Sequence, residues 1–154
     1  MDIIKSEDSK LLASLNKDIQ NLHFEMYPEK YKPYDYKAFV DFYDQLFKND
    51  KVDCFVCYED NSPIGYFVFE ERIQPDSPFS KEQKAIYIQQ VFVFNTLRKK
   101  GVGAAIMEYI KETARSRGIK LIELAVKYKN ESAAEFFSKM GFVPFNTMSE
   151  LILE

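Results

Sequence analysis

The pattern of hydrophobic positions is most informative in the middle of the chain. Residues 85–94 (AIYIQQVFVF) carry no charge and contain neither Pro nor Gly. Because Ile, Val, Phe and Tyr favour extended backbone, this segment predicts a central β-strand. After a short turn over residues 95–97, apolar residues recur at helical spacing up to Gly118, at Val102, Ile106, Tyr109 and Ile110. The middle of the chain is therefore predicted to form a strand, a turn and a helix.

The same patterns predict the other elements. On the N-terminal side we expect a strand over residues 2–5 and then one helix, which buries Leu11, Leu12, Leu15, Ile19 and Leu22. After this helix we expect a loop rich in Tyr and Pro over residues 27–36 and a second helix over residues 35–48. A hairpin of strands 52–58 and 64–73 and an exposed loop over residues 74–83 follow. On the C-terminal side we expect a strand over residues 120–127, a helix that begins after Asn130, and two last strands over residues 143–145 and 149–153.

Composition limits the class of protein. A chain of 154 residues with 46% hydrophobic content is long enough for one well-buried domain, so we expect one domain over residues 1–154. The formal net charge of −3 argues against a general nucleic-acid-binding protein, which needs a basic surface. No apolar run has the length of a membrane span, and the first ten residues (MDIIKSEDSK) do not have the pattern of a secretory signal. We expect a soluble cytoplasmic protein that binds neither nucleic acid nor membranes.

The two cysteines, Cys54 and Cys57, have the C-x-x-C spacing that occurs in redox and zinc sites. They lie inside the predicted strand 52–58, where residues three positions apart point to opposite faces. The sequence has one histidine and no second cysteine pair to complete a metal site. We therefore expect two buried free thiols and no bound metal.

Candidate chemistry lies between the central strand and the following helix, in the sequence Arg98-Lys99-Lys100-Gly101-Val102-Gly103. Two glycines at a helix start let the backbone approach a ligand, and unpaired N–H groups with three cations favour an anion such as a pyrophosphate. The nucleotide-triphosphate pattern is excluded, because it needs a second glycine five residues after the first, then Lys and Ser or Thr. The dinucleotide pattern is excluded because Ile106 stands where it needs Gly or Ala. A solvated basic turn is the remaining alternative.

What remains, Arg-x-x-Gly-x-Gly after a hydrophobic strand, resembles the acyl-coenzyme A loop of the GNAT acetyltransferase superfamily. The segment Asn130-Glu-Ser-Ala-Ala-Glu-Phe-Phe-Ser-Lys-Met-Gly141-Phe142 is similar to the family's second signature, in which Asn opens a helix and Gly-Phe ends it. The resemblance spans residues 85–142. It implies an α/β (α+β) GNAT fold with a mixed, mostly antiparallel sheet flanked by helices, in the order β-αα-βββ-α-β-α-ββ. It also implies acetyl-CoA as cosubstrate and, because dimers are frequent in the family, allows a homodimer.

The resemblance also implies where the coenzyme binds. A backbone N–H at the end of the central strand would point at the acetyl oxygen, and stabilising an oxyanion in this way is often the largest catalytic contribution. The strand residues at that place are Val91, Phe92 and Val93. The turn and the helix start would supply Arg98, Lys99, Lys100, Gly101, Val102, Gly103 and Ala104, and the last helix Asn130 and Phe137. Asn130 is also expected to cap that helix.

The chain departs from the family pattern where protons are handled. Gln89 and Gln90 stand where many members have a carboxylate that receives the proton of the amine, and Phe137 replaces the usual acid, a tyrosine. Making a lysine-like amine neutral at pH 7 costs about 4.6 kcal/mol, whereas releasing a coenzyme thiolate costs about 2 kcal/mol. The missing base should therefore matter more than the missing acid. The candidate catalytic residues that remain are Tyr87, Gln89 and Tyr128.

The acceptor is expected to bind beside the first helical region and the loop after it, at His23, Glu25, Tyr27 and Tyr31. Aromatic rings near carboxylates suit a cationic amine, although surface packing explains the tyrosines equally well, and a lone histidine is more often structural. The sequence thus predicts an N-acetyltransferase that moves an acetyl group from acetyl-CoA to a primary amine of a small molecule or peptide, by direct attack in a ternary complex. The alternative is a GNAT-fold protein that binds and senses acyl-CoA without turning it over.

Overall fold

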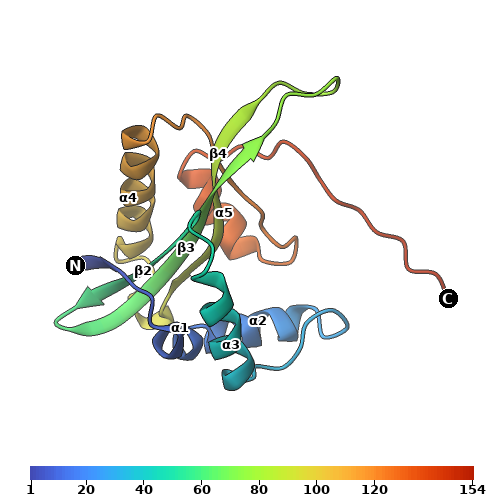
Figure 1. Ribbon diagram of the computed structural model, residues 1–154. Coiled ribbons are helices and arrows are strands. Elements are labelled where there is room, and N and C mark those ends of the chain that lie inside the picture. The colour runs from blue at the N-terminus through green and yellow to red at the C-terminus, as the bar shows by residue number, and fades with distance from the viewer.

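The computed structural model describes residues 1–154, and its centre is one five-stranded sheet in the order β1-β2-β3-β4-β5 (Figure 1). The strands are β1 (Asp2–Lys5), β2 (Val52–Glu59), β3 (Ser62–Gln74), β4 (Gln83–Val93) and β5 (Ile122–Leu124). Neighbouring strands are antiparallel except β4 and β5, which are parallel. The predicted mixed, mostly antiparallel sheet flanked by helices is confirmed.

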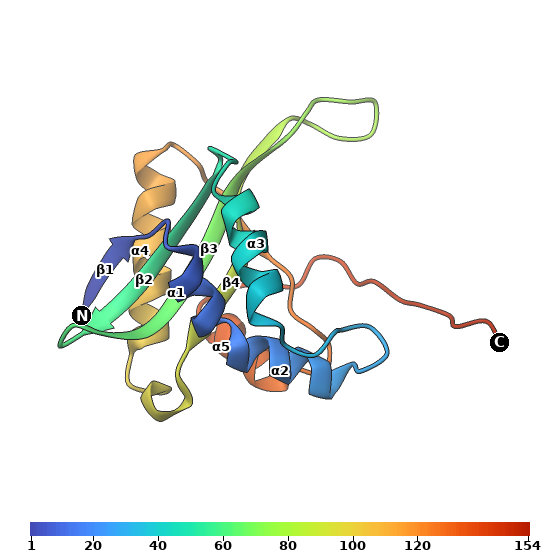
Figure 2. The same cartoon turned by 60° about the horizontal axis from the view of Figure 1, so that its bottom comes forward.

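Helices cover both faces of the sheet (Figures 1 and 2). On one face lie α1 (Ser9–Leu15), α2 (Lys17–Met26) and α3 (Tyr36–Leu46), and on the other α4 (Val102–Ser116) and α5 (Glu131–Lys139). A short 3-10 helix, η1 (Asn95–Leu97), joins β4 to the turn before α4. Each face has its own hydrophobic core, because alternate residues of a strand point to opposite sides. None of the helices has the length and apolar character that crossing a membrane requires.

The two cysteines lie on opposite faces of β2, as predicted. Cys54 is buried in the core below α1 and α3, and Cys57 in the core below α4. Burial raises the pKa of both thiols to about 12. Both side chains are therefore protonated free thiols that pack as small apolar groups.

The prediction of one helix across residues 11–22 is wrong, because the chain bends at Asn16. Asn16 ends α1 and precedes the first residue of α2, so three helices, and not two, come before β2. Its side chain is buried, and its Nδ2 donates to Tyr66 Oη at 2.8 Å and to Tyr43 Oη at 3.2 Å. A buried amide is stabilised by such bonds, so this residue is held at the core and the helical pattern is divided around it.

The two last predicted strands are also wrong. Residues 143–154 form neither strand nor helix, and every one of them is exposed. Pro144, in the middle of the predicted strand 143–145, has no N–H to donate to a ladder, which disfavours a strand at this place. The predicted strand 120–127 shortens to β5, so the observed order is β-ααα-βββ-α-β-α.

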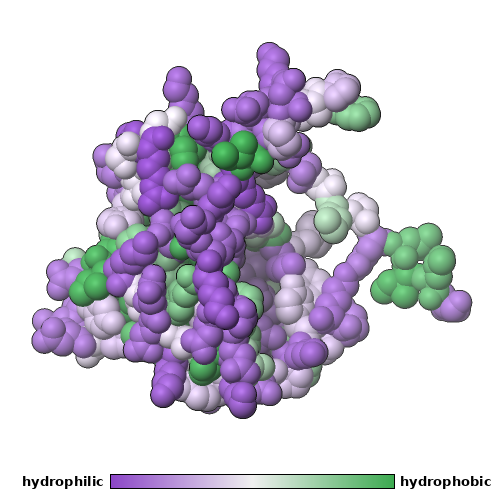
Figure 3. All heavy atoms as spheres, viewed as in Figure 1, coloured by the Kyte–Doolittle hydropathy of each residue, from purple (hydrophilic) through white to green (hydrophobic).

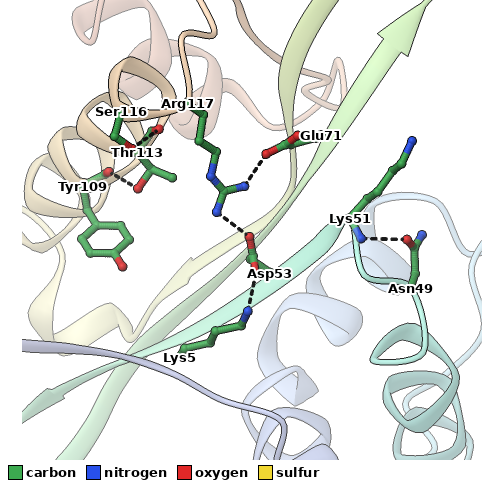
Figure 4. A network of polar contacts seen from close by, with 9 residues as sticks. All are labelled: Lys5, Asn49, Lys51, Asp53, Glu71, Tyr109, Thr113, Ser116 and Arg117. Carbon is green, nitrogen blue, oxygen red and sulfur yellow. Dashed lines mark hydrogen bonds and ion pairs between the residues drawn. The ribbon is translucent and has the colours of Figure 1, made fainter.

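An ion-pair network fixes one end of the sheet to the end of α4 (Figure 4). The buried Asp53 carboxylate on β2 pairs with Lys5 of β1 at 2.6 Å and with Arg117 at 2.8 Å, and Arg117 also pairs with Glu71 of β3 at 2.6 Å. Burial alone would raise the pKa of Asp53, but the hydrogen bonds from Lys5 and Arg117 outweigh it and lower this pKa. The network therefore depends on an ionised Asp53.

Candidate active site

The site begins at an irregularity of β4. Val68 of β3 faces Gln90, and the next residue, Phe69, faces Ile88, so Gln89 is an extra residue in the ladder, a β-bulge. The bulge changes which face the side chains point to. Ile88 packs below α4, whereas Phe92, four residues on, packs below α1 and α3. In an unbroken strand these two side chains would share a face.

Strands β4 and β5 part at the same place. They pair only where Ile86–Ile88 faces Ile122–Leu124, and beyond that the β5-facing edge of β4 has no strand beside it. A cavity of about 350 Å³ opens there, between residues 87–91 of β4 and residues 124–127, which begin with the last residue of β5. It lies beside the bulge in β4 and the carboxyl end of β5.

A neutral hydrogen-bond network forms one wall of the cavity. The Gln90 Oε1 atom accepts from Tyr43 Oη at 2.7 Å and from Asn16 Nδ2 at 3.4 Å. Burial raises the pKa of Tyr43 to about 12 and that of Tyr66 well above its usual value, so both phenols stay protonated. Sequence reasoning missed Asn16, Tyr43 and Tyr66. A signal existed for Asn16, because it lies four residues after Leu12, on the core face of the helical pattern.

His23 is the one imidazole of the chain, and it lines the cavity. Its ring lies 5.1 Å from the ring of Tyr31, and Lys127 Nζ lies 5.3 Å from the centre of the same Tyr31 ring. Burial, and after it the charge of Lys127, lowers the pKa of His23 below its usual 6.5. At neutral pH this side chain is therefore an uncharged base.

The basic turn lies beyond the end of β4 and does not line the cavity. Lys99 and Gly101 have positive φ angles of 63° and 86°, and Gly101 is the N-cap of α4. Arg98 Nε donates to Val93 O at 3.3 Å, which bends this side chain back along β4. The backbone N–H groups of residues 101–104 form no hydrogen bond within the chain. Free N–H groups at the positive end of a helix dipole, with three adjacent cations, favour an anion.

The helix α5 brings the second sequence signature beside the first. Asn130 caps α5 as predicted, because its Oδ1 accepts from the Ala133 N–H at 3.2 Å. Phe137 lines the cavity, and Phe136 packs into the core against Gly103. The residues of both signatures are therefore in direct contact.

The structure brings only some of the predicted site residues to the cavity. Those that line it are His23, Tyr87, Gln89, Val91, Asn130 and Phe137. The Phe92 side chain is buried on the other face, so only its backbone could meet a ligand here, and Val93 packs below α4. Tyr128 is 95% exposed and does not line the cavity, and neither do Glu25, Tyr27 and Tyr31. The Tyr27 hydroxyl accepts from the Lys129 N–H at 3.0 Å, so it holds the turn before α5.

A sheet whose parallel strands part at a bulge, beside a glycine turn that opens a helix, defines the GNAT class of acetyltransferases. Residues 16–142 match the acetyltransferase (GNAT) family, and the chain belongs to that family. An uncharacterized N-acetyltransferase of Methanocaldococcus jannaschii is 26% identical over 148 residues, which is 92% of this chain and 64% of the relative's length. The chain thus spans less than two thirds of that relative.

Two solved structures share the fold. A mutant protein from Bacillus halodurans superposes with a TM-score of 0.92 at 22% identity, over 100% of both chains. A predicted acetyltransferase of Clostridium acetobutylicum, crystallised with acetyl-CoA, superposes with a TM-score of 0.71 at 19% identity, over 98% of this chain and 95% of its own.

Proposed function

We propose that this protein is an N-acetyltransferase that moves the acetyl group of acetyl-CoA to a primary amine of a small molecule or peptide, by direct attack within a ternary complex. The observation that carries the proposal is the parting of β4 and β5 at Gln89. It opens a cavity beside a backbone edge of β4 that has no strand partner. The acetyl-CoA bound to the Clostridium acetobutylicum protein supports the choice of cosubstrate.

The coenzyme would extend from the basic turn to the cavity. Its pyrophosphate would accept hydrogen bonds from the free N–H groups of residues 101–104, with Arg98, Lys99 and Lys100 supplying positive charge. Its arm would pass Asn130 and Phe137, which line the side of the cavity formed by α5. The thioester would then lie beside residues 89–91, where a backbone N–H of β4 can donate to the acetyl oxygen.

The acceptor would enter from the side of α2 and α3. Its nitrogen forms a bond to the thioester carbon, and the oxygen of the tetrahedral intermediate is stabilised by the backbone. The carbon–sulfur bond then breaks to release the coenzyme thiolate, which takes up the proton that the new amide nitrogen loses. The proton of the ammonium group has to leave before attack. His23 is the uncharged base that lines the cavity, so it replaces the strand carboxylate as proton acceptor, directly or through water.

The acceptor side of the cavity has a defined chemical character. Phe39, Phe42 and Ile19 supply apolar surface, and Gln20 and Gln90 supply neutral amides. Lys127 is the charged side chain of the lining at neutral pH. Desolvating several ammonium groups here would cost free energy without a carboxylate to compensate, so a monoamine with an apolar or aromatic body fits better than a polyamine.

The test is calorimetric binding of acetyl-CoA to the wild type and to the double variant Arg98→Ala, Gly101→Asp. We expect the variant to lose binding, because it removes a cation and places a carboxylate at the free N–H groups. The matched control is Arg115→Ala, Gly118→Asp. This control also replaces a basic residue and a glycine with a positive φ angle (68°), but at the other end of the same helix. It should bind acetyl-CoA as the wild type does.

Turnover is then measured as thiol release with aromatic monoamines, polyamines and peptides. Acetylation of a monoamine in preference to a polyamine is the expected result. Binding of acetyl-CoA without acetylation of any amine would favour the sensing alternative, and absence of binding by the wild type would overturn the proposal.

A further inference from the structure

One charged side chain, Lys127, lies among the residues that line the cavity. His23 is uncharged at neutral pH, and the other lining residues are apolar or neutral. None of the ion pairs of the chain includes Lys127. An ammonium group has three N–H donors and no acceptor, so its strongest partners are anions. The cavity therefore has a positive charge that the chain itself does not balance.

The loop that carries Lys127 is fixed to the end of α2. Both fixing contacts come from Lys129, two residues further along this loop. The Lys129 backbone N–H donates to Tyr27 Oη at 3.0 Å, and the Lys129 Nζ atom donates to the Met26 carbonyl oxygen at 3.0 Å. Lys127 is thus presented to the cavity from a loop that is held in place beside α2.

The ammonium group of Lys127 lies on the acceptor side of the cavity. Its Nζ atom is 5.3 Å from the centre of the Tyr31 ring, within the range of a cation–π interaction. The same ring lies 5.1 Å from the ring of His23, and the charge of Lys127 acts on the pKa of His23. The three cations of the basic turn, in contrast, do not line the cavity. Lys127 is therefore placed to act on the acyl acceptor and not on the pyrophosphate.

The nearby carboxylates of the chain do not balance this charge. Glu25 of α2 is exposed and does not line the cavity. Glu150 of the C-terminal segment pairs with Lys30 instead. Both ribbon views show this segment running outward from the end of α5, and in Figure 3 the hydrophobic side chains near its end stand clear of the body. An anion that meets Lys127 in the cavity would therefore come from a ligand.

We propose that the acyl acceptor is a small amine that also carries a carboxylate, and that Lys127 binds this carboxylate while the amine lies beside His23. The inference deepens the proposed function and rests on it. An acceptor that enters the cavity displaces water from Lys127, and a carboxylate offsets this cost by accepting charge-assisted hydrogen bonds. Its apolar body would contact Phe39 and Phe42, which line the cavity.

The carboxylate would also change the base that the reaction needs. Lys127 lowers the pKa of His23, so an anion bound to Lys127 offsets this effect and raises that pKa. A base whose pKa lies closer to the working pH accepts a proton more readily. A neutral acceptor leaves the charge of Lys127 in place. The site would therefore select a carboxylate by rate as well as by affinity.

The first experiment measures binding of two probes that differ in charge, phenylacetate and phenylacetamide, with and without coenzyme A. Neither probe has an amine, so the result does not depend on catalysis. We expect the wild type to bind phenylacetate about tenfold more tightly than phenylacetamide, and Lys127→Gln to lose this preference. The matched control is Lys120→Gln, at an exposed position before β5, which should keep the preference.

The second measurement is the pKa of His23 by NMR, in which the one histidine of the chain gives one imidazole signal. Phenylacetate should raise this pKa in the wild type, and phenylacetamide should not. In Lys127→Gln the pKa should be higher before any probe is added, and phenylacetate should change it little. A purely structural role of Lys127 would not produce this pattern.

Turnover separates this inference from the proposed function. Among aromatic amines the wild type should acetylate an aminomethyl-substituted phenylacetate with a KM about tenfold below that of its amide, and Lys127→Gln should remove the difference. Equal affinity for the two probes, no binding of phenylacetate, or a preference that persists in Lys127→Gln would overturn the inference even if amines are acetylated. Weaker binding of acetyl-CoA to Lys127→Gln would also overturn it, because Lys127 would then contact the coenzyme. The expected probe preference without acetylation of any amine would support the anion site and count against the proposed function alone.

Discussion

Gly103 of α4 and Phe136 of α5 lie so close that a β-carbon on residue 103 would stand 2.9 Å from Cζ of the Phe136 ring. This contact joins the basic turn, where we place the pyrophosphate, to the helix whose Phe137 lines the cavity. The glycine is therefore needed for the packing of the two helices as well as for access to the backbone.

The variant Gly103→Ala tests this contact. In an open helix this change would stabilise the chain by about 1 kcal/mol, but here the methyl group meets the Phe136 ring, and we expect a net loss of about 1–3 kcal/mol. The affinity for acetyl-CoA should fall as well, because α5 is displaced. Urea unfolding and calorimetry measure the two effects. Adding Phe136→Leu to the variant should restore part of the stability and part of the affinity for acetyl-CoA. If Gly103→Ala has the same effects in the Phe136→Leu background as in the wild type, the coupling between the two residues is disproved.

His23 should control the acid side of the pH profile of kcat/KM. Because burial and Lys127 lower its pKa below 6.5, the wild type should keep its activity down to a lower pH than a free imidazole allows. His23→Gln should abolish the fall of kcat/KM at acidic pH that protonation of His23 causes, and should reduce kcat/KM by about 100-fold. Asp18→Asn, an exposed position of the same helix, is the control. An unchanged profile in His23→Gln would mean that another group accepts the proton.

The same pKa shift affects stability. The folded state binds fewer protons at His23 than the unfolded state does, so this residue should make the free energy of unfolding rise with pH between its lowered pKa and 6.5. Unfolding titrations across that range should show the rise in the wild type and its loss in His23→Gln.

The sequence predicted most of the sheet because each strand has a strong local signal. The hydrophobic run of residues 85–94, the mostly apolar residues 52–58 and the Asn130 cap each depend on neighbouring residues alone. The break at Asn16 and the missing last strands were not predicted. The first depends on Tyr43 and Tyr66, which are 27 and 50 residues away in sequence. Whether the last two segments form strands depends on whether another strand is available to pair with them.

The candidate site was predictable only in part for the same reason. The signature residues identified the basic turn and α5, but the bulge at Gln89 is a property of the pairing between β3 and β4. No local pattern marks it. The network around Gln90 likewise joins three segments that are distant in sequence, so the role of Tyr43 becomes visible only in the fold.

Tyr43→Phe tests whether the orientation of Gln90 matters for catalysis. The change removes the hydroxyl that donates to Gln90 Oε1 at 2.7 Å and should cost about 1 kcal/mol of stability. We also expect a lower kcat with little change in affinity for acetyl-CoA. Tyr34→Phe is a matched control, because its hydroxyl donates to Ala13 O at 2.6 Å, away from the cavity lining. If both variants lose stability and neither loses activity, the network has a structural role only.

Asp53→Asn should destabilise the fold in a manner that depends on pH. At neutral pH the change removes two charge-assisted interactions, with Lys5 and Arg117, and should cost about 1–3 kcal/mol. Because the pKa of Asp53 is lowered in the folded state, its contribution is complete above the unfolded value of about 3.9 and disappears as the pH falls through the lowered pKa. The difference in stability between wild type and variant should therefore be constant from neutral pH down to about 4 and shrink below it. Urea unfolding at several pH values measures this, with Asp50→Asn, an exposed position beside β2, as control. A difference that stays constant below pH 4 would show that the ion pairs of Asp53 do not cause the loss.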